Sequence, residues 1–231
     1  MFIPLKDENP TNTFPYVTVF IIAVNVGAFF FQLFSQQGLQ FFVYKMGAIP
    51  YEITHFKSLS YMIAHSGEHL VRISPPLSLL TSMFLHGSFL HLLGNMLYLW
   101  IFGNNVEDYL GPIRFLLFYL VSGLAAASAH ILFNPNSQVP MIGASGAIAG
   151  VLGAYFILYP KANVLTLVFI WIVPIPAAII LGIWFVMQVM NVGIGGGVAW
   201  FAHIGGFLVG IALLKIYQAR GKRDKLNFST P

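Results

Sequence analysis

Residues 140–160 read PMIGASGAIAGVLGAYFILYP, an apolar run without a charged residue and with a proline at each end. A helix needs about 20 mostly apolar residues to cross the hydrocarbon core of a bilayer. The part of this run predicted to be helical, about 143–159, is shorter than that. It is therefore expected either to thin the bilayer or to begin below the membrane surface, in a recess lined by protein. A single serine, Ser145, lies near its start.

The composition of the whole chain is that of a membrane protein. Of its 231 residues, 58% are hydrophobic and 8% are charged, whereas a soluble domain is about 25% charged. Most of the surface is therefore expected to face lipid. The absence of cysteine excludes a disulfide framework and a thiolate metal site. No cleavable signal peptide is expected, because the first apolar run starts near Phe14, after charged residues, and exceeds a signal core of about 7–15 residues.

Apolar runs divide the chain into six predicted transmembrane helices. They lie at about 16–35, 77–103, 113–133, 143–159, 163–187 and 198–218. The predicted fold class is an all-α membrane protein, a six-helix bundle within about 14–218. Its long first outside loop, about 36–76, mixes apolar and polar residues, so that part of it is expected in the membrane interface. The chain is predicted to be one domain, 1–231, with a basic tail at 219–231.

Lysines and arginines are distributed unequally between the two sides of the predicted bundle. With six spans, both termini and the second and fourth loops share one side, which holds Lys6, Arg114, Lys161, Lys215, Arg220, Lys222, Arg223 and Lys225. The other side holds Lys45, Lys57 and Arg72. The positive-inside rule therefore predicts that both termini are cytoplasmic. The basic tail is expected to lie beside anionic lipid, which explains the net charge of +4 without a nucleic-acid partner.

Three short motifs place polar side chains inside predicted spans, where such groups are costly unless paired and are functional candidates. They read HGSFLHLLGN at 86–95, GASG at 143–146 and AHIGGFLVG at 202–210. The second, fourth and sixth spans, which carry them, all enter from the outside. Ser145 and His203 are therefore expected within about two turns of the outside helix ends. The three motifs are predicted to meet at one modest depth, provided that the second span begins later than Leu77.

Glycines recur at helical spacing beside two of these motifs. They are Gly146, Gly150 and Gly153 on the fourth span, and Gly206 and Gly210 on the sixth. Small residues four positions apart let two helix backbones approach closely in lipid. If the two glycine stripes pack together, the side chains of Ser145 and His203 come within hydrogen-bond distance.

Ser145 and His203 are the candidate catalytic residues. A serine hydroxyl becomes a nucleophile when a base accepts its proton during the attack, and histidine suits that role near neutral pH. A triad would also need an acid to orient the base. The acids on the outside are Glu52 and Glu68, and both lie in the first loop. The sequence therefore predicts a Ser–His dyad.

The candidate oxyanion and substrate-binding residues are His91, Asn95, Gly143 and Ser145. The negative oxygen of a tetrahedral intermediate needs preorganised hydrogen-bond donors. Ser145 lies at a predicted helix start, where backbone N–H groups lack partners and the helix dipole is positive. His91 and Asn95 are four residues apart on one face of a helix, so both can donate to one point.

The three motifs, in this order on three inward-running spans, resemble those of the rhomboid family of intramembrane serine proteases. The resemblance covers about 14–218. It implies hydrolysis of a peptide bond in or next to a transmembrane helix of a membrane-protein substrate, with no metal or organic cofactor. It also implies that the substrate arrives laterally from the bilayer, past a mobile fifth helix and the loop NVGIGGG at 191–197.

Residue by residue, the resemblance places the nucleophile of the family on Ser145 and its general base on His203. The oxyanion donors fall on His91, Asn95 and the backbone N–H of Ser145. His86 matches a histidine with a supporting role near the cavity mouth.

The sequence departs from the family pattern at two places. Leu77-Ser78 replaces a frequent Trp-Arg pair in the first loop. Ala149 replaces an aromatic residue that stacks on the base in some members. The support of His203 is therefore not identified by the sequence.

Other classes of function fit the chain less well. The alternative is a catalytically silent relative that binds transmembrane helices without cutting them, although such relatives typically lose the serine or the histidine. A solute transporter is disfavoured because no inverted repeat and no intramembrane ion pair occurs. A zinc protease is disfavoured because HExxH is absent, and because His86 and His91 point about 140° away from each other on a helix.

The compact chain fits a multi-pass protein of the bacterial inner membrane, with its site open to the outside face. The expected partners are the lipid bilayer and transmembrane protein substrates. The sequence names neither the substrate nor the oligomeric state.

Overall fold

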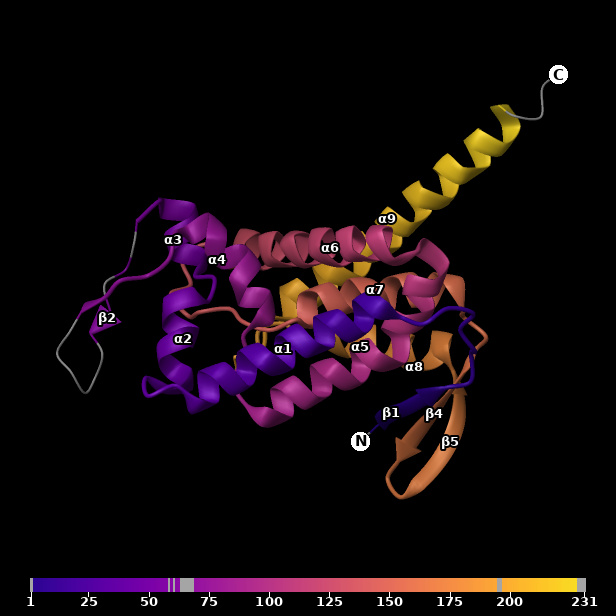
Figure 1. Cartoon of the computed structure of the whole chain (residues 1–231), viewed down its shortest axis with the longest axis horizontal. Coiled ribbons are helices and arrows are strands. Elements are labelled where there is room, and N and C mark those ends of the chain that lie inside the picture. The colour runs from indigo at the N-terminus through magenta and orange to yellow at the C-terminus, as the bar shows by residue number, and fades with distance from the viewer. Residues whose placement is uncertain (1, 58, 60, 63–68, 195–196, 228–231) are drawn as a thin grey trace.

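The computed structural model describes residues 2–57, 59, 61–62, 69–194 and 197–227. In chain order the helices are α1 (Tyr16–Phe34), α2 (Gly38–Met46), α3 (Pro50–His55), α4 (Pro75–Thr81), the 3₁₀ helix η1 (Ser82–Phe84), α5 (Phe89–Leu110), α6 (Pro112–Phe133), α7 (Ser145–Leu158), α8 (Ala177–Met190) and α9 (Trp200–Asn227). The strands are β1 (Phe2–Asp7), β2 (Tyr61–Met62), β3 (His69–Leu70), β4 (Asn163–Val168) and β5 (Trp171–Pro176). Figure 1 shows the long helices side by side in one bundle, with β1, β4 and β5 at one end and α2, α3 and β2 at the other.

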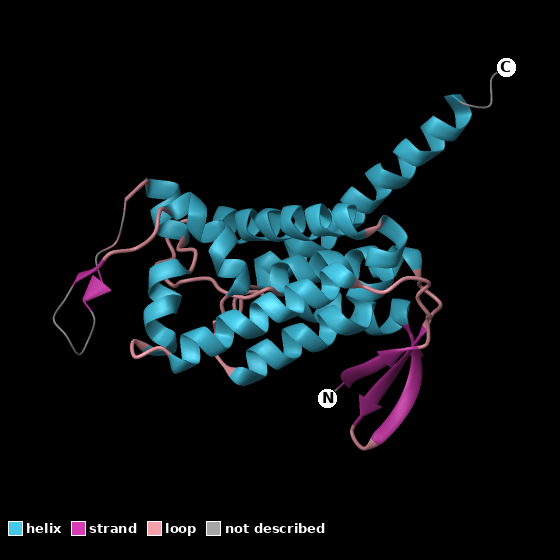
Figure 2. Cartoon of the chain, in the orientation of Figure 1, coloured by secondary structure: helices cyan, strands magenta, loops and turns pink. Residues whose placement is uncertain are grey.

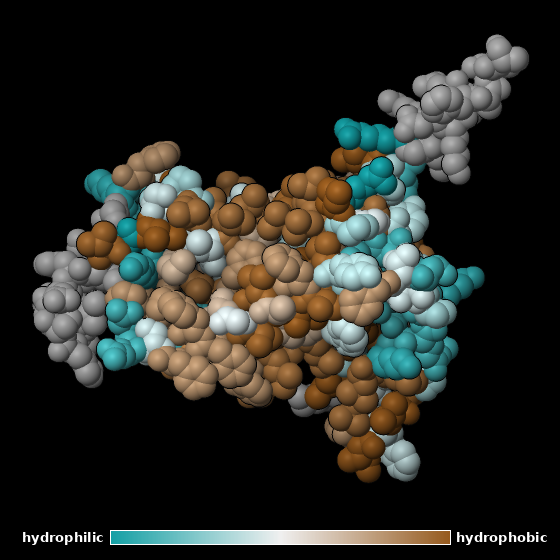
Figure 3. Space-filling model, viewed as in Figure 1, coloured by the Kyte–Doolittle hydropathy of each residue, from teal (hydrophilic) through white to brown (hydrophobic). Residues whose placement is uncertain are grey.

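The lengths of the helices make this an integral membrane protein. Among the described residues, α1, α6 and the part of α9 from Trp200 to Arg220 are long and apolar enough to cross a membrane alone. The pair of α4 with η1 and α5 qualifies as one broken span, bent by 79°. The helices α7 and α8 are apolar but shorter. Figure 3 shows apolar surface over the middle of the bundle and hydrophilic residues gathered toward the end that carries the sheet.

The predicted second helix, 77–103, is wrong at its start. The helices α4 and η1 end before Leu85, which is extended, and α5 begins only at Phe89. The hydroxyl of Ser88 accepts a hydrogen bond from the backbone N–H of His91 over 3.2 Å and so caps α5. An N-cap residue has non-helical backbone angles, so the capping serine interrupts the helix.

The predicted fifth helix, 163–187, is helical only from Ala177. Its first part is an antiparallel hairpin of β4 and β5, and β4 also pairs with β1, in the order β1-β4-β5 (Figure 2). Residues 163–176 read NVLTLVFIWIVPIP, rich in the β-branched and aromatic side chains that favour strands, and an edge strand tolerates proline. The predicted all-α class is therefore wrong at this sheet, and Pro174 and Pro176 belong to β5 rather than to a helix.

The first outside loop is organised around a buried ion pair. Nε of Arg72 lies 2.8 Å from Oε2 of Glu52, and both side chains are almost fully buried. Nη2 of Arg72 donates to the carbonyl oxygen of Gly47 over 2.8 Å. Arg72, two residues after β3, therefore ties together α3 and the end of α2. Glu68, the other acid expected on this side, lies outside the described residues.

Polar contacts close the end of the bundle that carries the sheet. The carboxylate of Glu107 accepts the backbone N–H of Thr18 over 2.7 Å and so caps the start of α1. The carboxylate of Asp7 accepts the hydroxyl of Tyr155 and the side-chain amide of Asn105, each over 2.7 Å. Burial raises the pKa of Asp7, and these hydrogen bonds oppose the rise.

Helix α7 lies in the middle of the bundle. Its residues from Gly146 to Tyr155 are all buried. A Cβ on Gly206 would collide with the carbonyl oxygen of Gly146, and one on Gly210 with that of Gly150. The two glycine stripes therefore pack against each other as the sequence predicts, and α9 lies directly against α7.

Candidate active site

The segment that precedes α7 places Ser145 at a helix start. Gly143 has a φ of +114°, which favours glycine, and its N–H donates to the carbonyl oxygen of Ser82 over 2.8 Å. Backbone hydrogen bonds between Ala48 and Met141 hold the same segment to the first loop. Because α7 begins at Ser145, the N–H of this residue has no acceptor within the helix.

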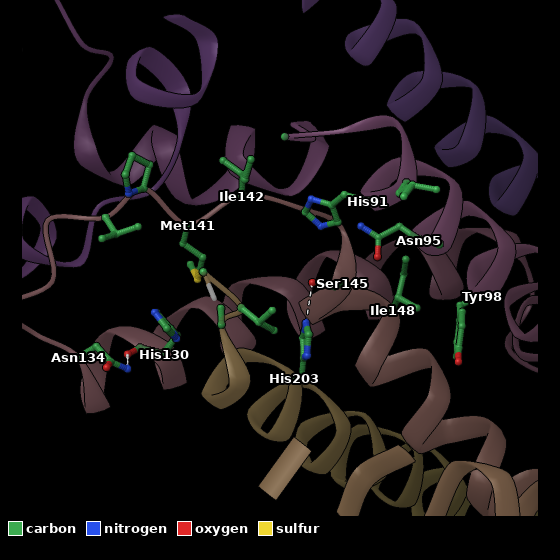
Figure 4. Close-up of a pocket in the computed structure, with 18 of the residues that line it drawn as sticks. His91, Asn95, Tyr98, His130, Asn134, Met141, Ile142, Ser145, Ile148 and His203 are labelled. Carbon is green, nitrogen blue, oxygen red and sulfur yellow. Dashed lines mark hydrogen bonds between the residues drawn. The ribbon is translucent and has the colours of Figure 1, made fainter. Parts of the chain in front are cut away.

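The side chains of Ser145 and His203 are in direct contact. Oγ of Ser145 lies 2.8 Å from Nε2 of His203, a hydrogen bond that joins α7 to α9 (Figure 4). The glycine packing accounts for the short distance, since Gly206 lies about one turn after His203 and rests against the carbonyl group of Gly146. The structure thus brings together the two residues predicted as catalytic.

The other ring nitrogen of His203 has a partner that was not predicted from the sequence. Nδ1 lies 2.8 Å from Oε1 of Gln188 on α8. The rings of Trp184 and Trp200 flank the imidazole, with centroids 5.9 Å and 6.2 Å away. His203 is thus supported by these three residues and not by position 149. The sequence carried a signal for Gln188, because a glutamine in an apolar span is itself a costly polar group.

His91 and Asn95 point toward the segment before α7. A Cβ added to Gly143 would lie 2.7 Å from Nε2 of His91 and 3.6 Å from Nδ2 of Asn95. In Figure 4, Ser145 lies between these two side chains and the imidazole of His203. All the residues predicted for the site therefore surround one point next to the serine hydroxyl.

His86 lies behind this pair. Its side chain is fully buried, and its Nε2 lies 2.9 Å from Nδ2 of Asn95. Its ring meets that of His91 edge to face, with centroids 5.0 Å apart. These contacts hold both candidate donors, which fits the supporting role expected for His86.

The candidate site opens into a cavity of about 810 Å³. Its polar lining residues are His91, Asn95, Tyr98, His130, Asn134, Ser137, Ser145 and His203, and its apolar ones include Leu90, Ile148, Leu152, Trp184 and Val198. His130 and Asn134 had no role in the sequence-based prediction. A few polar groups within apolar walls are typical of a site that orients one polar part of an otherwise apolar ligand.

No carboxylate lies among the described residues that line the cavity. Glu52, which the sequence left as a possible acid, binds Arg72 with one oxygen and accepts the N–H of Leu59 with the other over 2.6 Å. Among the described residues, no three His, Asp or Glu side chains gather as metal ligands would. The groups assembled at Ser145 are thus a hydroxyl, imidazoles and amides.

Residues 74–220 match the family model described as Rhomboid domain. This stretch is more than half of the chain and contains all three polar motifs. The chain belongs to the rhomboid family. Rhomboid membership accounts for the order of the motifs along the chain and for their meeting at one cavity.

Several named rhomboid proteins are similar to this one. It is 33% identical over 150 residues to Rhomboid protein 1, mitochondrial, of Saccharomyces cerevisiae, covering 60% of this chain and 41% of that relative. It is 36% identical over 142 residues to RHOMBOID-like protein 6, mitochondrial, of Arabidopsis thaliana, covering 58% and 41%. It is 39% identical over 148 residues to Rhomboid protease GluP of Bacillus subtilis, covering 63% and 28%. The matched region is therefore less than half the length of each of these relatives.

Proposed function

We propose that this rhomboid protein is a serine-type intramembrane endopeptidase. It hydrolyses a peptide bond in or next to a transmembrane helix of a membrane-protein substrate. The observation that carries the proposal is the 2.8 Å contact between Oγ of Ser145 and Nε2 of His203. His203 accepts the proton of the hydroxyl as Oγ attacks the peptide carbonyl, and then returns it to the leaving amine. A water molecule activated by the same imidazole hydrolyses the acyl-enzyme.

The negative oxygen of the tetrahedral intermediate is stabilised by three donors. The backbone N–H of Ser145 is free of an intrahelical acceptor and lies at the positive end of α7. The ring of His91 and the amide of Asn95 converge on Gly143, two residues before Ser145. Donors held in place before the charge develops lower the barrier because they need no reorganisation.

In the membrane, the three long helices, the broken pair and the two short helices form six spans. The shortness of α7 puts Ser145 below the outside surface, within the cavity, where water for hydrolysis reaches it. Both termini lie on the cytoplasmic side, in accord with the positive-inside count. The substrate arrives laterally past α8 and the loop 191–197, of which Gly195 and Gly196 lie outside the described residues. A bacterial inner membrane stays a prediction, since relatives of this rhomboid protein include mitochondrial ones.

The decisive experiment is covalent labelling with a fluorophosphonate probe, which reacts only with an activated serine. Wild type in detergent should be labelled, whereas Ser145→Ala and His203→Ala should not. Ser128→Ala is the matched control, because within the described part of the chain the hydroxyl of this serine on α6 donates only to the carbonyl of Leu124. This variant should be labelled like the wild type. Labelling that persists in Ser145→Ala would move the nucleophile elsewhere. A folded wild type that is not labelled and cleaves no helical substrate would support the silent, helix-binding alternative.

A further inference from the structure

Gln188 bridges two helices at the base of the proposed dyad. It lies near the end of α8 and is 6% exposed. Its amide nitrogen, Nε2, donates to the carbonyl oxygen of Trp184 over 2.9 Å. Its amide oxygen, Oε1, lies 2.8 Å from Nδ1 of His203 on α9.

This pair of contacts decides which nitrogen of His203 carries the proton. A backbone carbonyl can only accept, so the NH₂ group of Gln188 faces Trp184 and its oxygen faces the imidazole. An amide oxygen can only accept as well, so Nδ1 of His203 donates. A neutral imidazole has one N–H, which leaves the lone pair on Nε2. The hydroxyl of Ser145 therefore donates to Nε2, as a nucleophile must before it is activated.

We infer that Gln188 is a positioning residue that holds His203 in the tautomer able to accept the proton of Ser145. This inference rests on the proposed function. In a Ser–His–Asp triad a carboxylate orients the base and stabilises the imidazolium that forms. Here a neutral amide oxygen orients the ring, and its dipole faces the ring as the imidazolium forms. Since Gln188 belongs to α8 and His203 to α9, the base is aligned only while α8 rests against α9.

The test compares Gln188→Met and Gln188→Glu with wild type. Methionine has a similar length but no oxygen, whereas glutamate keeps an acceptor near Nδ1. We expect Gln188→Met to lower kcat at least about tenfold, with KM changed less than about twofold. A positioned base contributes roughly 10²–10⁴-fold to the rate, and loss of its orientation should remove part of that contribution. Gln188→Glu should recover much of this loss. It should also move the acid limb of the pH–rate profile to higher pH, because a carboxylate stabilises the imidazolium.

Val189→Met is the matched control, since this neighbouring residue of α8 is half exposed on the apolar surface. It should leave both kcat and the pH profile unchanged. Equal losses in both Gln188 variants, with an unshifted pH profile and a lowered thermal midpoint, would show a packing role only and overturn the inference. Failure of the wild type to react with the serine probe would instead refute the proposed function.

A second inference concerns the hairpin of β4 and β5. Residues 163–176 contain no charged residue, and β5 is an edge strand. At the tip, Phe169, Ile170, Trp171 and Ile172 are 80%, 81%, 70% and 60% exposed. An exposed apolar edge strand in water is a site of aggregation, and natural proteins cover or charge such edges. Among the described residues, the exposed edge of this hairpin is neither covered nor charged. We therefore infer that the hairpin is not surrounded by water alone.

The hairpin lies beside the lipid-facing surface of the bundle. The N–H of Ala177, the first residue of α8, donates over 2.8 Å to the carbonyl of Ala162, the residue before β4. This bond fixes the base of the hairpin at the start of α8. Figure 3 shows the apolar tip projecting next to the hydrophilic end of the molecule and continuous with the apolar belt of the bundle. The opposite side of the sheet, β1, carries the exposed Lys6.

We propose that the hairpin tip inserts into the interface of the adjacent membrane leaflet, with the lipid bilayer as its occupant. Tryptophan and other aromatic residues favour this region, where an apolar ring and a polar group are both satisfied. The insertion stays shallow, because the unpaired backbone groups of an edge strand need water or headgroups as partners. Pro174 and Pro176 reduce the number of such groups by removing two N–H donors.

The absence of cysteine allows a direct test in vesicles of phosphatidylcholine and phosphatidylglycerol. Ile170→Cys carries a fluorophore whose quenching by doxyl-labelled lipid and by aqueous iodide is compared with that of Lys6→Cys. We expect the probe at 170 to be quenched by the lipid and shielded from iodide, and the probe at 6 to behave in the opposite way. Iodide quenching at 170 would overturn the proposal. The proposal would also be overturned if the probe at 170 were shielded from iodide but not quenched by the lipid, and if this shielding disappeared when the protein is diluted. A second copy of the chain would then cover the tip.

Discussion

The side-chain amide of Asn95 lies 2.9 Å from Nε2 of His86, and both residues are buried beside the proposed nucleophile. A primary amide has two N–H donors. If one of them is used to fix the side chain on His86, the other is held toward the cavity, close to Gly143. The contact therefore explains how a flexible amide is preorganised as an oxyanion donor.

Removing this donor should slow turnover without unfolding the protein. Asn95→Ala is expected to lower kcat about ten- to a thousandfold, the usual effect of deleting one oxyanion donor. The measurement is steady-state cleavage of a transmembrane substrate, with the thermal midpoint followed in parallel. Unchanged kcat would remove Asn95 from the site. A loss fully explained by unfolding would do the same.

Gly143 provides a test of the site's geometry. Gly143→Ala places a Cβ 2.7 Å from Nε2 of His91 in a backbone conformation that disfavours alanine. Gly111→Ala is the matched control, because Gly111 also has a positive φ, +78°, but open space around it. Both variants should lose about 1–3 kcal/mol of stability from backbone strain. Only Gly143→Ala should also lose turnover at least about tenfold; equal turnover in the two variants would contradict this assignment.

The packing of α9 on α7 predicts a stability difference between two glycines. Gly206→Ala would press a Cβ against the backbone carbonyl of Gly146, which has no freedom to move aside, so α9 must shift. We expect a loss of about 1–3 kcal/mol, typical of overpacking, together with slower labelling of Ser145. Gly27→Ala, with open space on α1, should be neutral or slightly stabilising, as alanine favours helix. Thermal unfolding in detergent measures both.

The buried carboxylate of Asp7 predicts a pH dependence of stability. Its pKa is raised above the ordinary value of 3.8 by burial, so its stabilising contribution is present below that pH and is lost as the pH rises through the raised pKa. Asp7→Asn keeps an oxygen acceptor for Tyr155 and cannot ionise. The thermal midpoint of Asp7→Asn minus that of wild type should therefore increase with pH over this interval and then level off. A difference that does not vary with pH would refute the burial effect.

Local sequence was sufficient for the residues of the candidate site. Polar side chains in apolar spans are rare because of their cost, so the motifs around His91, Ser145 and His203 stand out without knowledge of the fold. Glycines spaced four apart predicted the approach of α7 and α9 because the spacing is a property of any helix. Gln188 carries the same kind of signal, but a single amide has no motif around it that would point to a role beside His203.

Two elements were predicted wrongly from the sequence. Residues 163–176 carry side chains that favour strands, but periodicity alone does not distinguish a short uncharged apolar strand from the start of a buried helix. This weak local signal did not separate the β4–β5 hairpin from a fifth span that begins at residue 163. The pairing of β4 with β1, from the opposite end of the chain, stabilises the strand form. For the second span, the polar residues near His86 indicated a start later than Leu77 but not a break in the helix before α5, because the capping role of Ser88 depends on the backbone conformation that it adopts.

The sequence by itself determined that the protein lies in a membrane and belongs among the rhomboid proteins. It also determined which serine and histidine are available. Hydrophobicity and helical periodicity are properties of neighbouring residues, so they can be read without the fold. Only the tertiary structure decided the partner of His203, the convergence of His91 and Asn95 on Gly143, and the sheet at the other end of the bundle. Each of these depends on contacts between segments far apart in the chain, whose distances no local pattern encodes.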